Sequence, residues 1–186
     1  RPRDPRARVT RMHPKGYNSI ASTYHFRQVT AMKWMDFLDR VGDEPVVTTG
    51  LLLAGQANRS GVERQLSRWT AAGRLMQLGR GVYTVAPPFR TRQPHPVILA
   101  NRVRRPSYVS LQSALSHWGL VPEGLASVTS VTTGRPGTVR TSVGEFAYRH
   151  VTTTWFHGYE DAHLHQDPDQ SVLVATAEKA LLDLVY

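Results

Sequence analysis

Six basic or polar residues between positions 59 and 80 have the types and spacing with which proteins read nucleic acids. They are Arg59, Ser60, Arg64, Ser67, Arg68 and Arg80. Arg64 and Arg68 are one helical turn apart, and a guanidinium can bind guanine through two hydrogen bonds, worth about 1–3 kcal/mol of discrimination. Arg59 and Ser60 would begin the same helix, where free backbone N–H groups favour a phosphate. The alternatives for this polar face are a helix side that only meets solvent, or a surface that docks another protein.

Three short helices are expected to position these residues. Apolar residues recur at helical spacing within 30–41, where Thr30 can act as the N-cap, and a threonine at 48 or 49 can cap a second helix over 51–53. Ser60 is expected to cap a third helix. One face of that helix carries its apolar or small residues, Val62, Leu66, Trp69 and Gly73.

Two apolar runs, 75–78 and 82–85, follow the third helix and predict a β-hairpin. A glycine on each side of Arg80 supplies the positive φ angles of a tight turn, so Arg80 would reach the DNA backbone or minor groove from the tip. Helix, helix, turn, helix and hairpin is the order of a winged helix-turn-helix, whose third helix enters the major groove. We therefore predict a DNA-binding domain over residues 30–86.

The net charge of +9 is concentrated in the first part of the chain. Residues 1–29 have a net charge of +6, residues 30–86 of +2 and residues 87–110 of +5, whereas residues 111–186 have −4. This asymmetry indicates two modules with different partners, and the basic one favours a polyanion such as double-stranded DNA. A basic surface that is only solvated is the alternative.

Two basic segments interrupt the periodic patterns. Residues 1–29 predict an N-terminal arm that could follow a phosphate backbone, with an unstructured leader as the alternative. Residues 87–106 contain five prolines and predict a linker, broken by a short apolar run that could be a helix or a strand. Its Arg102, Arg104 and Arg105 could add phosphate contacts or simply keep the linker solvated.

Residues 107–186 predict a small mixed α/β domain, which makes the whole chain α+β. Ser110 caps a helix at its start, and Thr176 caps a last helix that is apolar on most sides and should be deeply buried. Strands are expected over 127–133, 139–143, 145–151 and 152–156. The polar, histidine-rich stretch 157–170 is expected to be a loop. The apolar pattern is still running at Tyr186, so we expect the natural chain to continue.

Composition excludes several other classes of protein. The chain has no cysteine, which rules out disulfides, iron–sulfur clusters and a cysteine nucleophile and suits a reducing compartment. No apolar run approaches the roughly 18 residues of a membrane span, and the basic start is not followed by the apolar stretch of a signal peptide. We expect a cytoplasmic protein.

No catalytic residue, cofactor or metal is expected. A metal-dependent nuclease needs an acid and a lysine separated by one residue on a strand, whereas Glu178 and Lys179 are adjacent and follow Asp169 at a distance. Ser110 and His117 lie at opposite ends of two helical turns and cannot form a nucleophile–base pair. Four residues of the polar stretch could suggest a metal site, His157, Asp161, His163 and His165. They lack the helical spacing of a ligand pair, so a solvated loop is the better interpretation.

Several segments carry a resemblance to a known family. They are the hairpin 79–83, the helical run 108–123 (YVSLQSALSHWGLVPE), the strands 128–133 and 144–151, the pair Phe156-x-Gly158 and the closing run 175–186. Together they resemble the AbiEi-like antitoxins of type IV toxin–antitoxin systems, over about residues 30–186. The arm 1–29 is not part of the family pattern.

The resemblance implies a function for each module. The winged helix of such antitoxins binds inverted repeats in the promoter of its own operon and represses it. The second domain counters a nucleotidyltransferase-like toxin encoded next to it, directly or indirectly. The alternative is a winged-helix transcriptional regulator without a toxin partner, and a metal-dependent nuclease is a more remote one.

Overall fold

The computed structural model describes residues 32–54, 58–122, 126–164 and 167–186. The chain divides into a unit of residues 1–30 and a unit of residues 31–186. The predicted arm lies outside the described residues and stays a prediction. The predicted cap at Thr30 is wrong, because the first helix begins at Trp34 and its N-cap position is Lys33. The described part mixes helices with two β-sheets, which confirms the α+β class.

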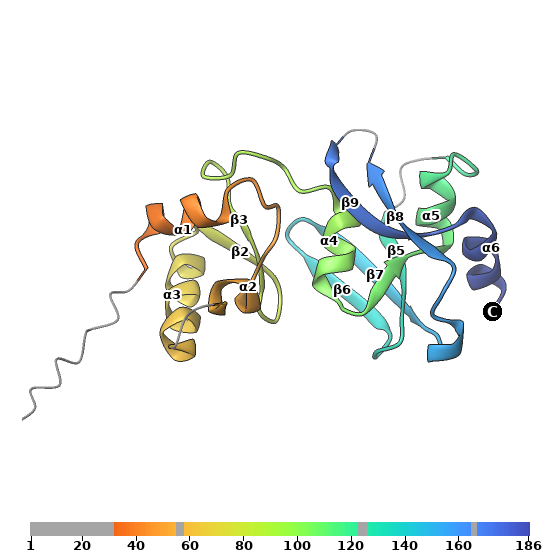
Figure 1. The fold of residues 1–186 in the computed structure, drawn as a ribbon, viewed down its shortest axis with the longest axis horizontal. Helices are drawn as coiled ribbons and strands as arrows, with labels where there is room; N and C mark the ends of the chain where they lie inside the picture. The colour runs from red at the N-terminus through yellow and green to blue at the C-terminus, as the bar shows by residue number, and fades with distance from the viewer. Residues whose placement is uncertain (1–31, 55–57, 123–125, 165–166) are drawn as a thin grey trace, which may run out of the picture. The chain divides into compact units, whose positions relative to one another are not determined.

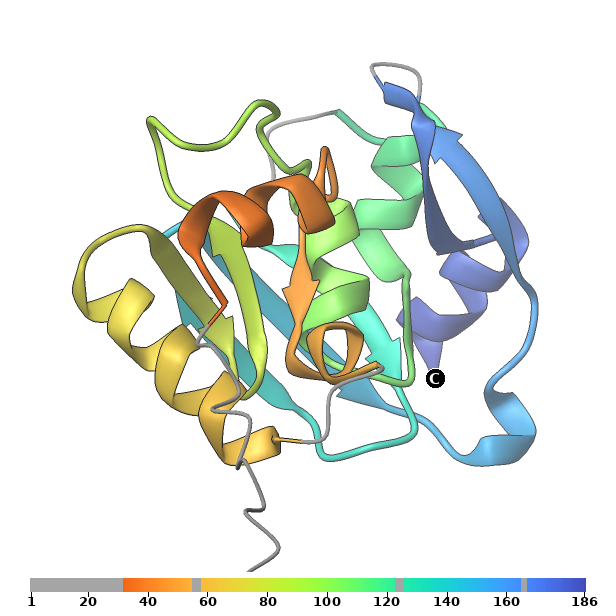
Figure 2. The same cartoon turned by 60° about the vertical axis from the view of Figure 1, so that its left-hand side comes forward.

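The elements of the first part follow the order of a winged helix (Figure 1). They are α1 (Trp34–Val41), β1 (Val47–Thr48), α2 (Thr49–Leu53), α3 (Arg59–Ala71), β2 (Leu75–Gly79) and β3 (Val82–Val85). The three strands form an antiparallel sheet in the order β1-β3-β2. Helix α3 packs against β2, and Figure 2 shows it beside the β2–β3 hairpin.

An aromatic cluster forms the centre of this winged-helix part. The ring of Trp34 stacks on Phe37 with 5.2 Å between centroids and meets Trp69 edge-on at 5.1 Å. Leu66 and Leu75 lie in the same buried cluster. Burying an apolar side chain of this size contributes about 1.5–3 kcal/mol, so α3 is held to the core through its inward face.

The second part is built on a six-stranded mixed sheet. Its strands are β4 (Ser107–Val109), β5 (Val128–Thr132), β6 (Gly137–Thr141), β7 (Gly144–His150), β8 (Tyr159–Leu164) and β9 (Asp167–Ala175). The strand order is β6-β7-β5-β4-β9-β8, with β5–β7 and β4–β9 parallel and the other pairs antiparallel.

Three helices accompany this sheet. They are α4 (Pro96–Val103), α5 (Leu111–His117) and α6 (Ala177–Val185). Helix α4 packs on β4, β5 and β9, while α5 packs on β5 and α6. Eight residues of the segment predicted as a linker are therefore folded, and the short apolar run in it is a helix with Ile98 and Leu99 buried.

Two expectations about the segment after β7 are wrong. The predicted strand over 152–156 is a single 3-10 turn, η1 (Thr153–Trp155). The predicted loop over 157–170 forms most of the β8–β9 hairpin, in which Asp161 pairs with Leu173. Backbone pairing does not require apolar side chains on an edge strand, so a polar stretch can still form β-structure.

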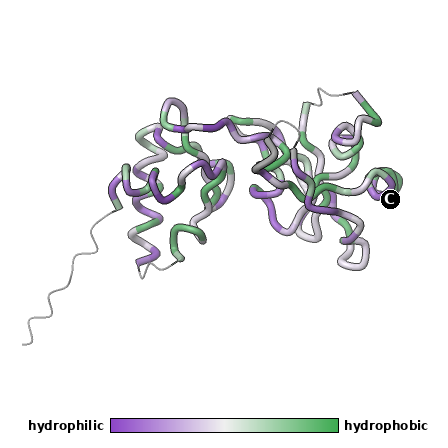
Figure 3. Tube along the Cα trace, turned by 45° about the horizontal axis from the view of Figure 1, so that its top comes forward, coloured by the Kyte–Doolittle hydropathy of each residue, from purple (hydrophilic) through white to green (hydrophobic). Residues whose placement is uncertain are grey.

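Helix α6 is also different from the prediction, because it is not deeply buried. Its buried residues are Lys179, Ala180 and Asp183. Its exposed residues include the apolar Leu181, Leu182, Leu184 and Val185, and Figure 3 shows the hydropathy along this helix next to the C-terminal end. Among the described residues, none of the helices has the length and apolar character required to cross a membrane.

Candidate nucleic-acid interface

Helix α3 begins at Arg59, so its N-cap lies two residues before the predicted cap, Ser60. Asn58 is the N-cap, and its side-chain Oδ1 accepts a hydrogen bond from the backbone N–H of Gly61 at 2.9 Å. Ser60 therefore lies inside the first turn, and its hydroxyl donates to the same Oδ1 at 3.1 Å. An asparagine in this position satisfies one of the free N–H groups of the first turn, which is why it caps the helix.

The outward face of α3 brings together five of the predicted DNA-binding residues. They are Arg59, Ser60, Arg64, Ser67 and Arg68, all exposed. The opposite face is fixed in the core by Val62, Leu66 and Trp69. Because residues three and four apart share one side of a helix, the residues at positions 60, 64, 67 and 68 form a continuous polar surface.

Local contacts already engage two of the arginines on this face. The Nε of Arg59 lies 3.0 Å from Oε1 of Glu63, in an exposed ion pair one turn along the helix. The Nε of Arg64 donates to the backbone carbonyl of Ser60 at 3.2 Å. Within the described residues, the side chain of Arg68 makes no hydrogen bond or ion pair. Its guanidinium is therefore the least committed of the three.

The hairpin places the sixth predicted residue, Arg80, in an exposed turn. Only one of the two glycines beside Arg80 has the predicted positive φ: Gly81 has a φ of +71°, whereas Gly79 ends β2 without one. A Cβ at Gly81 would lie 3.1 Å from Oγ1 of Thr49. The carbonyl of Gly81 accepts hydrogen bonds from the N–H of Thr49 at 2.9 Å and from its hydroxyl at 3.3 Å. These bonds tie the turn to the start of α2, so Arg80 projects from an anchored wing.

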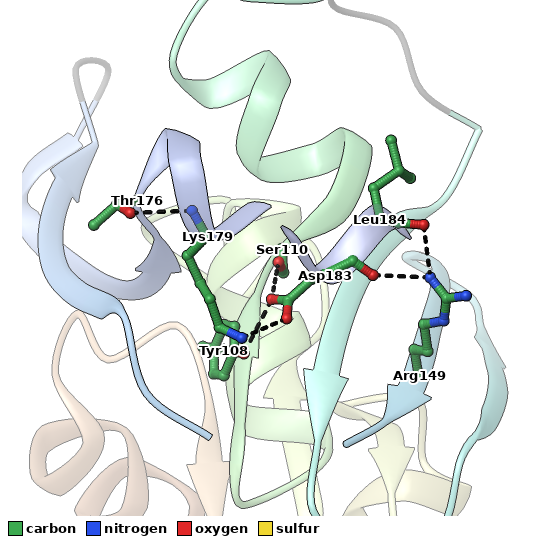
Figure 4. Close-up of polar contacts among 7 residues, drawn as sticks. All are labelled: Tyr108, Ser110, Arg149, Thr176, Lys179, Asp183 and Leu184. Carbon is green, nitrogen blue, oxygen red and sulfur yellow. Dashed lines mark hydrogen bonds and ion pairs between the residues drawn. The ribbon is translucent and has the colours of Figure 1, made fainter. Parts of the chain in front are cut away.

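The second part contains a buried polar network that was not predicted from the sequence (Figure 4). The carboxylate of Asp183 accepts hydrogen bonds from Nζ of Lys179 at 2.6 Å, from Oγ of Ser110 at 2.6 Å and from the hydroxyl of Tyr108 at 3.0 Å. The ammonium of Lys179 also lies 4.8 Å from the centre of the Trp155 ring. The network joins α6 to β4 and the residue that follows it.

Burial shapes the chemistry of this network. It raises the pKa of Tyr108 far above its ordinary value, and the charge of Asp183 raises that pKa further, so Tyr108 stays a hydrogen-bond donor. Ser110 caps α5 by position, yet its hydroxyl bonds Asp183 instead of the helix N–H groups. The Nη1 of Arg149 donates to the carbonyls of Asp183 at 2.9 Å and Leu184 at 3.3 Å, at the end of α6. The arrangement anchors a helix.

One of the residues weighed for nuclease chemistry, Lys179, lies in this network. Its side chain is only 4% exposed, and its ammonium pairs with Asp183. His165 lies outside the described residues. In the part of the chain that the structure covers, no group of three His, Asp or Glu residues is placed to hold a metal ion.

One signal for the network was present in the sequence. Lys179 and Asp183 are four residues apart, the spacing of a helical ion pair. The leucines between and after them predicted an apolar helix instead. The partners Tyr108 and Ser110 are more than 70 residues away along the chain, so no local pattern indicates them.

A comparison with known protein families finds a match in the first part of the chain. Residues 49–86, which contain α2, α3 and the wing, match the model of a family described as "Transcriptional regulator, AbiEi antitoxin". This match supports an AbiEi-like assignment. A search of curated proteins finds no match to the chain.

Proposed function

We propose that this AbiEi-like chain is a DNA-binding antitoxin that represses its own operon. The observation that carries the proposal is the outward face of α3, which lies inside the matched segment 49–86. In this proposal α3 enters the major groove, where Arg64, Ser67 and Arg68 face base edges. Arg59 and Ser60 contact phosphate, and Arg80 on the wing contacts the backbone or the minor groove.

The proposed target is double-stranded DNA with inverted repeats in the promoter of the operon. The arm 1–29 adds contacts to phosphates that do not depend on sequence, because its charge is strongly positive. Residues 107–186 form the antitoxin part, which counters a nucleotidyltransferase-like toxin directly or indirectly. A protein with this role acts in the cytoplasm, where the promoter is, and needs no cofactor.

The test is a titration of the protein against its own promoter and against a scrambled duplex, at two salt concentrations. A strong preference for the promoter at both concentrations is the expected result. Equal, salt-sensitive affinity for both duplexes would reduce the interface to a basic surface and contradict the proposed recognition helix.

A transcriptional regulator without a toxin partner is the second candidate, because the matched family is described as a transcriptional regulator. The two candidates differ in the neighbouring gene. Co-expression separates them directly: an antitoxin restores growth to cells that express the adjacent nucleotidyltransferase-like protein, whereas a regulator of other genes does not.

A further inference from the structure

A pocket of about 610 Å³ lies between the end of α4, the start of β4 and strands β8 and β9. Its size falls within the range of small-molecule sites, roughly 300–1,000 Å³. Its lining contains Arg102 and Arg105 together with the aromatic rings of Phe156 and Tyr159, which we call the aromatic wall. The pocket therefore offers both cationic and aromatic groups to a ligand.

Arg102 and Arg105 are two like charges whose side chains make no hydrogen bond or ion pair with the residues that the structure describes. Partial burial, followed by the charge of Arg102, lowers the pKa of Arg105 below its ordinary value. Arg104, between them, does have partners in the protein. Its guanidinium lies 4.7 Å from the centre of the Tyr148 ring and donates a hydrogen bond to the backbone carbonyl of Arg135.

The dipole of helix α4 stabilises only one of these two positive charges. Arg102 lies in the last turn of α4, where a cation is favoured by the partial negative charge of the helix end. Arg105 follows the helix and gains nothing from that position. A ligand anion would stabilise both guanidiniums, and two adjacent guanidiniums suit the oxygens of a phosphate or carboxylate.

The polar lining of the pocket includes a buried donor that lacks an acceptor. The Oδ1 of Asn101 accepts a hydrogen bond from the N–H of Leu173 at 2.7 Å, which fixes the orientation of the amide. Its Nδ2 is buried and has no partner among the described residues. Unpaired buried donors are uncommon in folded proteins.

The aromatic wall is held in place by its own packing. The Tyr159 ring stacks on Tyr108 with 4.7 Å between centroids and contacts Phe156 at 5.3 Å. Asp161 also lines the pocket, but in the described part of the chain it makes no ion pair with Arg102 or Arg105.

We propose that this pocket binds a small organic anion. The phosphate or carboxylate group of the ligand lies between Arg102 and Arg105, and its apolar or aromatic body lies against Phe156 and Tyr159. The proposal does not depend on DNA binding by α3.

Isothermal titration of the full chain at low ionic strength tests it, with phenyl phosphate, benzoate and inorganic phosphate as probes. Phenyl phosphate or benzoate should bind more tightly than inorganic phosphate, and the tighter of the two organic probes identifies the preferred oxyanion. The double variant Arg102→Gln/Arg105→Gln should lose about tenfold or more in affinity, because charge-assisted hydrogen bonds are lost. The variant Arg135→Gln removes a charge from the turn before β6 and should bind as the wild type does.

A second variant tests the pocket without changing its charge. Ser171→Trp places a large side chain on the exposed Ser171 of the lining and should weaken binding of the organic probes by at least as much as the double arginine variant does. The proposal is overturned if neither organic probe binds in the millimolar range, if the double arginine variant binds as well as Arg135→Gln, or if inorganic phosphate binds as tightly as the organic probes. A further outcome would also overturn the proposal. If no probe binds and the double variant binds duplex DNA more weakly than the wild type, the two arginines contact DNA phosphates instead.

Discussion

Replacing Glu63 by glutamine should strengthen DNA binding, although it removes an ion pair seen in the structure. The carboxylate of Glu63 holds Nε of Arg59 at 3.0 Å, and both side chains are more than half exposed. An exposed pair at this spacing stabilises a helix by about 0.3–0.5 kcal/mol, so Glu63→Gln should fold normally. The variant removes a negative charge from the proposed DNA face and frees a guanidinium.

The size of the effect follows from Coulomb's law and counterion release. Two unit charges about 6 Å apart interact by roughly 1–3 kcal/mol over the dielectric range from water to a protein surface, and salt reduces this further. We therefore expect promoter affinity to rise by about fivefold. If the freed Arg59 neutralises one more phosphate, the slope of log K against log salt should steepen by about 0.9.

Fluorescence anisotropy with labelled promoter DNA, over a series of salt concentrations, measures both quantities. The matched control is Glu145→Gln, which breaks another exposed ion pair, that of Arg140 with Glu145 at 2.7 Å, and changes the net charge equally. The control should leave affinity and slope nearly unchanged. An unaltered slope in Glu63→Gln, or an equal gain in both variants, would refute a local phosphate contact at Arg59.

Further variants test the recognition helix, the N-terminal arm, the cap of α3 and the buried network. Either Arg64→Ala or Arg68→Ala should cost about 1–3 kcal/mol on the cognate duplex and relax its sequence preference; an unchanged preference in both, in titrations with altered duplexes, would contradict the recognition-helix assignment. Removal of residues 1–29 should weaken binding to cognate and scrambled duplexes alike and flatten the salt dependence, and an unchanged slope would mean that the arm makes no phosphate contact. Asn58→Ala should lower the free energy of unfolding in urea by about 1 kcal/mol, because Gly61 N–H loses its acceptor. Asp183→Ala should lower it by about 3–5 kcal/mol, because a buried ammonium loses its carboxylate, and a loss below 1 kcal/mol would show that water reaches this site.

The winged-helix elements were predictable because local patterns determine them. Val62, Leu66 and Trp69 recur at the helical period, and a tight turn between apolar runs predicts the hairpin at Gly81. The cap was misassigned because Asn58 and Ser60 are both good capping residues, two positions apart. Only the bond from Gly61 N–H to the asparagine side chain distinguishes them.

The β8–β9 hairpin could not be predicted in the same way. Its first strand reads Tyr-Glu-Asp-Ala-His-Leu and lies at the edge of the sheet, so its stability comes from pairing with β9 more than from burial of its own side chains. In β9, Val172 and Val174 are buried while Leu173 is exposed. That alternation is the strand signal, but it covers too few residues to reveal the partner strand.

In the second part, the residues that carry the family resemblance are different from the residues proposed to read DNA. The runs 108–123 and 175–186, which resemble the AbiEi-like antitoxins, contribute Tyr108 and Ser110 on one side and Lys179 and Asp183 on the other. These four residues meet in the interior, so they account for how α6 is attached to the sheet. DNA reading rests instead on the exposed face of α3. A variant such as Asp183→Ala therefore tests the fold of the second part, whereas only changes on α3 and the wing test recognition of the promoter.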